Sequence, residues 1–111
     1  MKIILTFLIL LFTTMLQAAD YKLVYFEASW CGSCVKMTPV LDEYVKESKV
    51  NVTKVDIDKE TDIATEYKVK KVPTVAIVQT KDKKNKEIGR LEGFRPLAQF
   101  KVAIKEILNK K

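Results

Sequence analysis

The stretch VYFEASWCGSCVKMTP, Val24 to Pro39, contains both cysteines of the 111-residue chain. Cys31 and Cys34 are separated by two residues and follow the only tryptophan, Trp30. A pair at this spacing can be a structural disulfide, part of a metal site, or a reactive dithiol. The residues around the pair distinguish between these alternatives.

A buried strand is predicted before the cysteines and a helix after them. The segment YKLVYFEA, residues 21–28, is rich in β-forming and apolar residues, which is typical of a strand buried on both faces. After Cys34 the apolar residues recur at helical spacing as far as Ser48. Pro39 is expected to kink this helix, because proline lacks an amide hydrogen and its ring clashes one turn back.

The remaining sequence predicts a sheet covered by helices. Further strands are expected at 50–58, 72–80 and 86–94, and helices at 59–69, with Thr61 as N-cap, and from Pro96 onward. The first two strands are joined by a helix and should be parallel, whereas the last two are joined by a short polar turn and should form an antiparallel hairpin. The order β-α-β-α-β-β-α indicates an α/β fold, with a mixed four-stranded sheet and helices on both faces.

A metal site, a structural disulfide and a reactive dithiol each require different features elsewhere in the chain. Zinc takes four ligands, and the chain has no histidine and no third cysteine, so a metal would have to be shared between two chains. A structural disulfide that closes so short a loop would stabilise the fold little. At the junction of strand and helix, Cys31 would face unpaired N–H groups and the positive end of the helix dipole, which favour a thiolate. We therefore favour a redox dithiol, with Cys31 as nucleophile and Cys34 as the less exposed resolving thiol, and expect neither a metal nor a bound cofactor.

The first 19 residues differ in composition from the rest. Lys2 is their only charge, and an apolar run extends from Ile3 to Leu16. This pattern is typical of a secretory signal peptide, and the run is shorter than the roughly 20 residues of a membrane-spanning helix. We expect residues 1–19 to be a signal peptide and residues 20–111 to be one periplasmic or secreted domain. An uncleaved membrane anchor is the alternative.

The chain is basic, with a formal net charge of +6. Its densest run of lysines, residues 80–87, has no aromatic residue interleaved with it. Nucleic-acid binding by a basic segment commonly combines such charges with aromatic side chains. We therefore assign the charge to solubility and expect no nucleic-acid partner.

The segment WCGSC resembles the WCxxC active site of the thioredoxin superfamily. Pro39, five residues after Cys34, matches the helix-kinking proline of that family, and Pro73 in VPT matches its cis-proline. Three more positions also resemble the family: Lys54, Asp58 and Gly93. The resemblance covers residues 21–109 and implies a thioredoxin-like fold and thiol:disulfide oxidoreductase activity.

The resemblance also implies roles for residues around the cysteines. Trp30, Gly32 and Ser33 would support the active site, although simple core filling is an alternative for Trp30. Val72, Pro73 and Thr74 would bind the substrate chain, with the backbone of Val72 pairing as an added strand.

The sequence departs from the family pattern at three places. The additional first strand and helix of full-length thioredoxins do not precede the active-site strand. Tyr25 stands where the family has a buried acid, and we hypothesise that Glu27, on the same strand face and within reach of Lys54, handles some of the protons. A simple Glu27–Lys54 ion pair is the alternative. The Gly32-Ser33 interior lacks the histidine that oxidising relatives usually place there, which favours reduction or isomerisation over oxidation.

The sequence therefore predicts an exported, monomeric thioredoxin-like oxidoreductase that reduces disulfides of protein substrates. Resemblance to periplasmic relatives implies a membrane thiol reductase as its electron donor. Three alternatives remain: a Cu(I) carrier that uses the two thiolates, a disulfide oxidant or isomerase, and a chaperone or assembly subunit whose dithiol is incidental.

Overall fold

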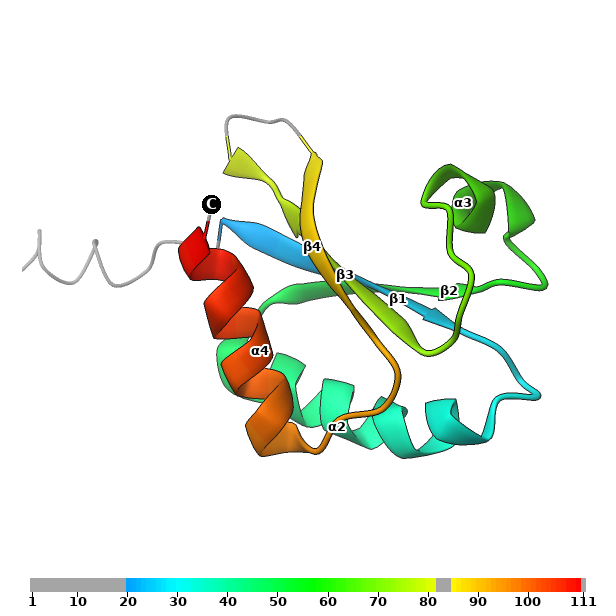
Figure 1. Ribbon diagram of the computed structural model, residues 1–111, viewed down its shortest axis with the longest axis horizontal. Coiled ribbons are helices and arrows are strands. Elements are labelled where there is room, and N and C mark those ends of the chain that lie inside the picture. Colours follow the sequence, from blue (N-terminus) through cyan, green and yellow to red (C-terminus); the bar gives the residue numbers. More distant parts are fainter. Residues whose placement is uncertain (1–19, 82–84, 111) are drawn as a thin grey trace, which may run out of the picture.

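The computed structural model describes residues 20–81 and 85–110, and Figure 1 shows the sheet with its helices. In chain order the elements are β1 (Tyr21–Glu27), α2 (Gly32–Ser48), β2 (Asn51–Asp56), α3 (Thr61–Glu66), β3 (Thr74–Gln79), β4 (Lys86–Glu92) and α4 (Leu97–Lys110). This order confirms the predicted α/β fold. The expected signal peptide lies outside the described residues.

The four strands form one mixed sheet in the order β2-β1-β3-β4. β1 and β2 are parallel, as expected for strands connected by a helix, and β3 pairs antiparallel with both β1 and β4. The predicted β3–β4 hairpin is therefore confirmed, with a register shift between Ile77 and Val78. As the second strand in this order, β1 is paired on both edges, which explains its strongly apolar sequence.

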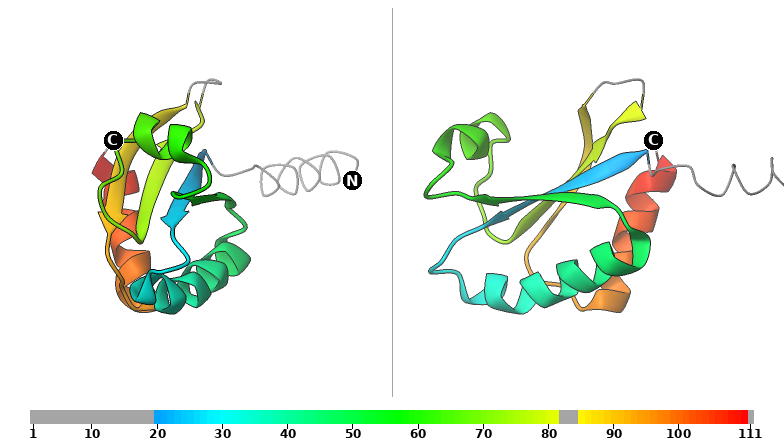
Figure 2. Two further views of the ribbon diagram at one scale, coloured as in Figure 1. Left: turned by 90° about the vertical axis from the view of Figure 1, so that its right-hand side faces the viewer. Right: turned by 180° about the vertical axis from the view of Figure 1, so that it is seen from behind.

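Helices cover both faces of the sheet (Figure 2). On one face, Leu23 and Tyr25 of β1 pack in a core with residues of α2 and α4, including Leu41 and Phe100. The alternate β1 residues point to the other face, where Phe26 belongs to a smaller core that is covered by α3 and the loop after it. The period of two along β1 thus separates the two cores.

The start of α3 differs from the prediction. Thr61 is the first helical residue instead of the N-cap, and Glu60 occupies the N-cap position without a capping side-chain hydrogen bond. The amides of Lys59 and Glu60 both bond to the carbonyl oxygen of Asp56, so the chain already turns before Thr61. Because of this tight turn, the helix begins at Thr61, one residue earlier than the preference of threonine for the N-cap position predicts.

Within residues 20–81 and 85–110, no helix has the length and apolar character needed to cross a membrane.

Candidate active site

The two cysteines lie at the start of α2, where β1 has ended and the chain has turned. The amide of Cys31 donates to the carbonyl oxygen of Ala28 at 3.2 Å, and Cys31 is the N-cap of α2. Its Sγ accepts a hydrogen bond of 3.1 Å from the amide of Cys34. The first turn of α2 carries no acidic residue. A thiolate on Cys31 would therefore be stabilised by a backbone N–H group and by the helix dipole.

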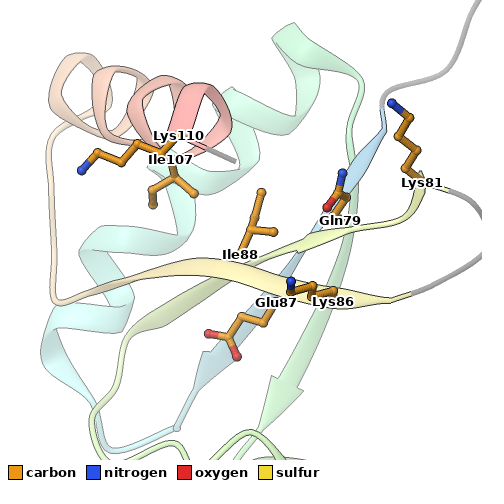
Figure 3. Close-up of a pocket in the computed structure, with 7 residues that line it drawn as sticks. All are labelled: Gln79, Lys81, Lys86, Glu87, Ile88, Ile107 and Lys110. Atoms are coloured by element: carbon orange, nitrogen blue, oxygen red, sulfur yellow. The ribbon is translucent and has the colours of Figure 1, made fainter.

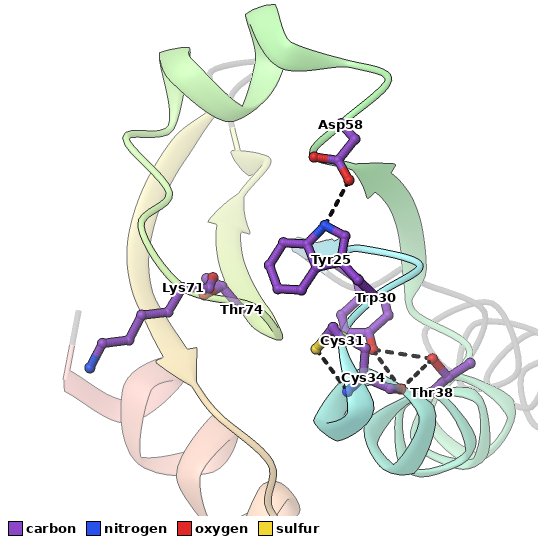
Figure 4. Close-up of a disulfide and its surroundings, with 8 residues drawn as sticks. All are labelled: Tyr25, Trp30, Cys31, Cys34, Thr38, Asp58, Lys71 and Thr74. Atoms are coloured by element: carbon purple, nitrogen blue, oxygen red, sulfur yellow. Dashed lines mark hydrogen bonds between the residues drawn. A yellow bond between two sulfur atoms is a disulfide. The ribbon is translucent and has the colours of Figure 1, made fainter.

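Cys31 and Cys34 are joined as a disulfide, with their Cα atoms 5.2 Å apart (Figure 4). Cys31 is 7% exposed and Cys34 is 3% exposed, so Cys34 is the less accessible thiol, as predicted. The two residues form a small apolar cluster with Ala28, against which Ile57 and Val72 pack. The residues between the cysteines, Gly32 and Ser33, are exposed at the surface.

The segment before β3 lies beside this cluster, through Val72. The Val72–Pro73 peptide bond is cis, and the carbonyl oxygen of Pro73 accepts a hydrogen bond of 2.8 Å from the amide of Gly93. Gly93 has a φ of 88°, which glycine adopts at little cost. The structure thus brings together three segments that are distant in sequence: the cysteines, the Val72–Pro73 pair and the Gly93 loop.

Thr74 does not fit the predicted role in substrate binding. Its side chain is fully buried, and its hydroxyl donates to the carbonyl oxygen of Lys71 at 2.7 Å (Figure 4). This hydrogen bond closes a turn around the cis bond. Thr74 therefore shapes the loop that presents Val72 and has no side-chain surface to offer a substrate.

Trp30 is 67% exposed, which excludes the core-filling alternative. Its indole N–H donates to Oδ2 of Asp58 at 2.8 Å, so a single hydrogen bond fixes the ring beside Cys31 (Figure 4). Two other exposed apolar residues, Val35 and Phe94, lie in chain segments next to the disulfide and the Gly93 loop. These side chains provide apolar surface for contact with another protein.

The predicted contact between Glu27 and Lys54 is wrong. The Nζ of Lys54 lies 3.0 Å from Oδ1 of Asp42 on α2. In the β1–β2 register Lys54 is opposite Tyr25, two pairs before Glu27, and its side chain reaches Asp42 of the helix instead. The pair is substantially exposed, so it stabilises the fold weakly. A role of Glu27 in proton handling stays a prediction.

Two hydroxyl groups beside the cysteines were not assigned a function from the sequence. Tyr25 Oη lies 3.1 Å from Thr38 Oγ1, and both contact the carbonyl oxygen of Cys34 (Figure 4). Burial raises the pKa of Tyr25, and the charges of Glu27 and Asp42 raise it further, while the Thr38 hydrogen bond opposes them. The spacing in the sequence could have indicated Thr38, because a residue four positions after Cys34 lies on the same face of the helix.

An open groove of about 590 Å³ lies between the β3–β4 hairpin and the end of α4 (Figure 3). It is lined by Gln79, Lys81, Lys86, Glu87, Ile88, Ile107 and Lys110. Gln79 pairs with the first residue of β1, whereas the cysteines follow its last residue. The groove therefore belongs to a different surface from the dithiol.

The Thioredoxin family profile matches residues 10–106 of the chain. The chain belongs to the thioredoxin family. It is 41% identical over 69 residues to a thioredoxin of Rickettsia felis, covering 60% of this chain and 66% of that protein. It is 35% identical over 80 residues to a thioredoxin-like protein of Synechocystis, covering 70% and 72% of the two chains. Mitochondrial thioredoxin 3 of Saccharomyces cerevisiae in its oxidised form superposes with a TM-score of 0.66 at 31% identity, over 88% of this chain and 89% of that one.

Membership of the thioredoxin family assigns a chemistry to the cysteine pair. Thioredoxins are disulfide oxidoreductases that act on protein disulfides. In this thioredoxin-family chain, Cys31 and Cys34 form the disulfide at the position where the helix dipole supports a thiolate. The chain is thus a thioredoxin-like protein with a Cys31–Cys34 pair that can form a disulfide, and it spans just under two thirds of the length of the Rickettsia felis thioredoxin.

Proposed function

We propose that this protein is an exported thiol:disulfide oxidoreductase that reduces disulfides in other proteins. The observation that carries the proposal is the position of Cys31 as N-cap of α2, with its sulfur bonded to the amide of Cys34. This arrangement favours a thiolate at the more accessible cysteine and places the second thiol one helical turn away.

The reaction proceeds in two exchange steps. The Cys31 thiolate attacks a substrate disulfide, forming a mixed disulfide and releasing one substrate thiolate, which takes a proton from water. Cys34 then loses its proton and attacks Sγ of Cys31. The Cys31–Cys34 bond forms, the second substrate thiolate leaves, and the substrate has gained two electrons while the protein has lost two.

The surface around the disulfide suits a protein substrate. Exposed apolar side chains at Trp30, Val35 and Phe94 offer contact area, and Val72 packs directly against the cysteine cluster. An extended substrate segment that paired with the backbone of Val72 would bring its own disulfide next to Cys31. No deep pocket is needed, since the reacting sulfur lies on the substrate protein.

Export is part of the proposal, and its support is the sequence of residues 1–19 alone. A charged start followed by an apolar run is typical of a signal peptide. In an oxidising compartment a reductant needs a supply of electrons, which we assign to a membrane thiol reductase, and we expect the protein to act as a monomer. Fractionation followed by mass spectrometry should find a chain that begins near Asp20 in the periplasm or medium. Full-length chain confined to the membrane fraction would instead indicate an anchor.

The experiment that tests the reaction is reduction of insulin disulfides with dithiothreitol as the electron source. The wild-type chain should accelerate the reaction, and Cys31→Ser should abolish the acceleration. Cys34→Ala should accumulate mixed disulfides that are visible on non-reducing gels. Thr65→Ala, an exposed change on α3, serves as the matched control and should behave like wild type. Failure of Cys34→Ala to trap any substrate would contradict the mechanism.

Nothing among the observations favours the Cu(I)-carrier alternative.

A further inference from the structure

Resolution of the mixed disulfide depends on how the first turn of α2 holds Cys34. Pro39 lies inside α2 and has no amide hydrogen, so the helical hydrogen bond to the carbonyl oxygen of Val35 is missing. The turn that directly follows Cys34, residues 35–39, therefore has one backbone hydrogen bond fewer than a regular helix. Side-chain hydrogen bonds to this part of α2 therefore matter more for holding its backbone in place.

Such contacts converge on the carbonyl oxygen of Cys34. Thr38 Oγ1 donates to it at 2.9 Å, Tyr25 Oη reaches it at 3.3 Å, and the two hydroxyls are 3.1 Å apart. Three contacts share only two hydroxyl protons. The arrangement with the shorter distances is a relay in which Tyr25 donates to Thr38 and Thr38 donates to the carbonyl, and such chains strengthen each bond.

Tyr25 is well fixed for this role. Its side chain has no exposed surface, because β1 presents it to the core beneath α2. The charged groups nearby are Glu27 on β1 and Asp42 on α2, which is paired with Lys54 of β2. With burial they keep the phenol protonated, since all three raise its pKa above the ordinary value near 10. At neutral pH Tyr25 is therefore a hydrogen-bond donor and not a proton acceptor.

We propose that Tyr25, acting through Thr38, is a positioning residue for the resolving cysteine, which it serves by fixing the carbonyl of Cys34 and with it the turn that aims the thiol at Cys31. This inference rests on the proposed exchange mechanism. The proton of Cys34 passes to water, and the departing substrate thiolate takes one up, so no buried base is required.

The two exchange steps can be separated with Ellman's reagent, 5,5′-dithiobis(2-nitrobenzoate). The reduced chain releases one thionitrobenzoate when Cys31 attacks the reagent and a second when Cys34 resolves the mixed disulfide. Stopped-flow measurements at a reagent concentration that makes attack the faster phase report each rate. We expect Tyr25→Phe to slow the second phase about 3- to 10-fold, the range of one buried hydrogen bond, and to leave the first phase unchanged.

Tyr21→Phe is the matched control. Tyr21 lies on the same strand and face as Tyr25, and its hydroxyl is bonded to that of Tyr44 at 2.7 Å, far from the disulfide. This variant should leave both phases unchanged. Thr38→Val removes the other member of the relay, keeps Tyr25, and should slow the second phase as well. The double variant Tyr25→Phe/Thr38→Val should be slowed by less than the product of the single effects, because one relay is broken twice.

Two results would overturn the inference. In one, Tyr25→Phe and Thr38→Val both match Tyr21→Phe in the second phase, so the relay does not position Cys34. In the other, Tyr25→Phe moves the pH midpoint of the second phase, which would make Tyr25 a proton carrier. A wild-type chain that shows no second phase would instead contradict the proposed function itself. Thr38→Val keeps the test decisive if Tyr25→Phe does not fold.

Discussion

A single hydrogen bond holds the exposed Trp30 ring next to the redox pair. Because its indole N–H donates to Asp58, this hydrogen bond restricts the orientation of the exposed ring. We expect Asp58→Ala to raise the KM for a protein disulfide about 2- to 5-fold with little change in kcat, since an ordered contact surface is lost while the thiols are untouched. Insulin-reduction kinetics measure both constants.

Asp58→Asn is the control for this prediction, because it keeps an acceptor oxygen and should remain close to wild type. Trp30 is the only tryptophan, so its fluorescence reports the same contact directly. An unchanged KM in Asp58→Ala, together with a changed emission spectrum, would show that the position of the ring does not matter to the substrate.

Two tyrosines, the half-buried Tyr21 and the fully buried Tyr25, make stability depend on pH in the alkaline range. Burial raises the pKa values of both Tyr21 and Tyr25 above about 10, and the Tyr44 hydrogen bond raises that of Tyr21 further. The folded state then holds these protons more tightly than the unfolded chain. The two tyrosines therefore contribute fully to the free energy of unfolding at pH values below their pKa in the unfolded chain. This contribution is lost as the pH rises through their higher pKa values in the folded state.

We therefore expect the free energy of unfolding to fall between about pH 10 and pH 12, and to fall less steeply in the double variant Tyr21→Phe/Tyr25→Phe. Urea titrations at several pH values measure this slope. Equal slopes for wild type and the double variant would mean that the phenols are not the titrating groups.

At the scale of elements, α4 packs closely on β4. A Cβ atom added at Gly89 would lie 2.8 Å from Cγ2 of Ile107, and this β-branched side chain turns only with difficulty. We expect Gly89→Ala to destabilise the fold by about 1–3 kcal/mol. Denaturant titration measures the change.

Gly32 provides the comparison, because nothing lies within 4 Å of the Cβ that alanine would add there. Gly32→Ala, at the start of α2, should be neutral or stabilising by up to about 1 kcal/mol. Gly89→Ala should also cost less when Ile107 is alanine. A cost that is independent of Ile107 would contradict the packing explanation.

The elements themselves were predictable because their patterns are local. The two-sided apolar pattern of residues 21–28 and the helical spacing after Cys34 are visible in the sequence, and both elements were found. Thr61 misled the prediction, because backbone bonds to Asp56 decide where α3 begins. Lys54 was assigned the wrong partner, since strand register and the distance to α2 are tertiary properties.

The site was predicted only in part, for the same reason. The cysteines and Val72 come together as the sequence indicated. The buried state of Thr74 and the contact of Tyr25 with Thr38 follow from how β3 and β1 pack, which spacing alone does not reveal. Residues adjacent in the chain were therefore assigned more reliably than residues that meet through packing.

For the whole molecule, the fold separates two surfaces at opposite ends of the sheet. The disulfide lies beyond the last residue of β1, and the lysine-rimmed groove lies where β1 begins. The exposed apolar residues Trp30, Val35 and Phe94 lie in segments next to the cysteines or the Gly93 loop, where a substrate protein would make contact. The contact surface therefore does not determine whether the protein reduces or oxidises its substrate. The reduction potential of the two cysteines determines that direction.

The reduction potential of the Cys31–Cys34 couple tests the central claim most directly. It is measured by equilibrating the chain in dithiothreitol and glutathione buffers and counting free thiols. A protein that reduces disulfides should have a value near that of thioredoxin, about −270 mV. A value of about −120 to −180 mV would make it an oxidant or isomerase and would contradict the proposed direction of electron flow.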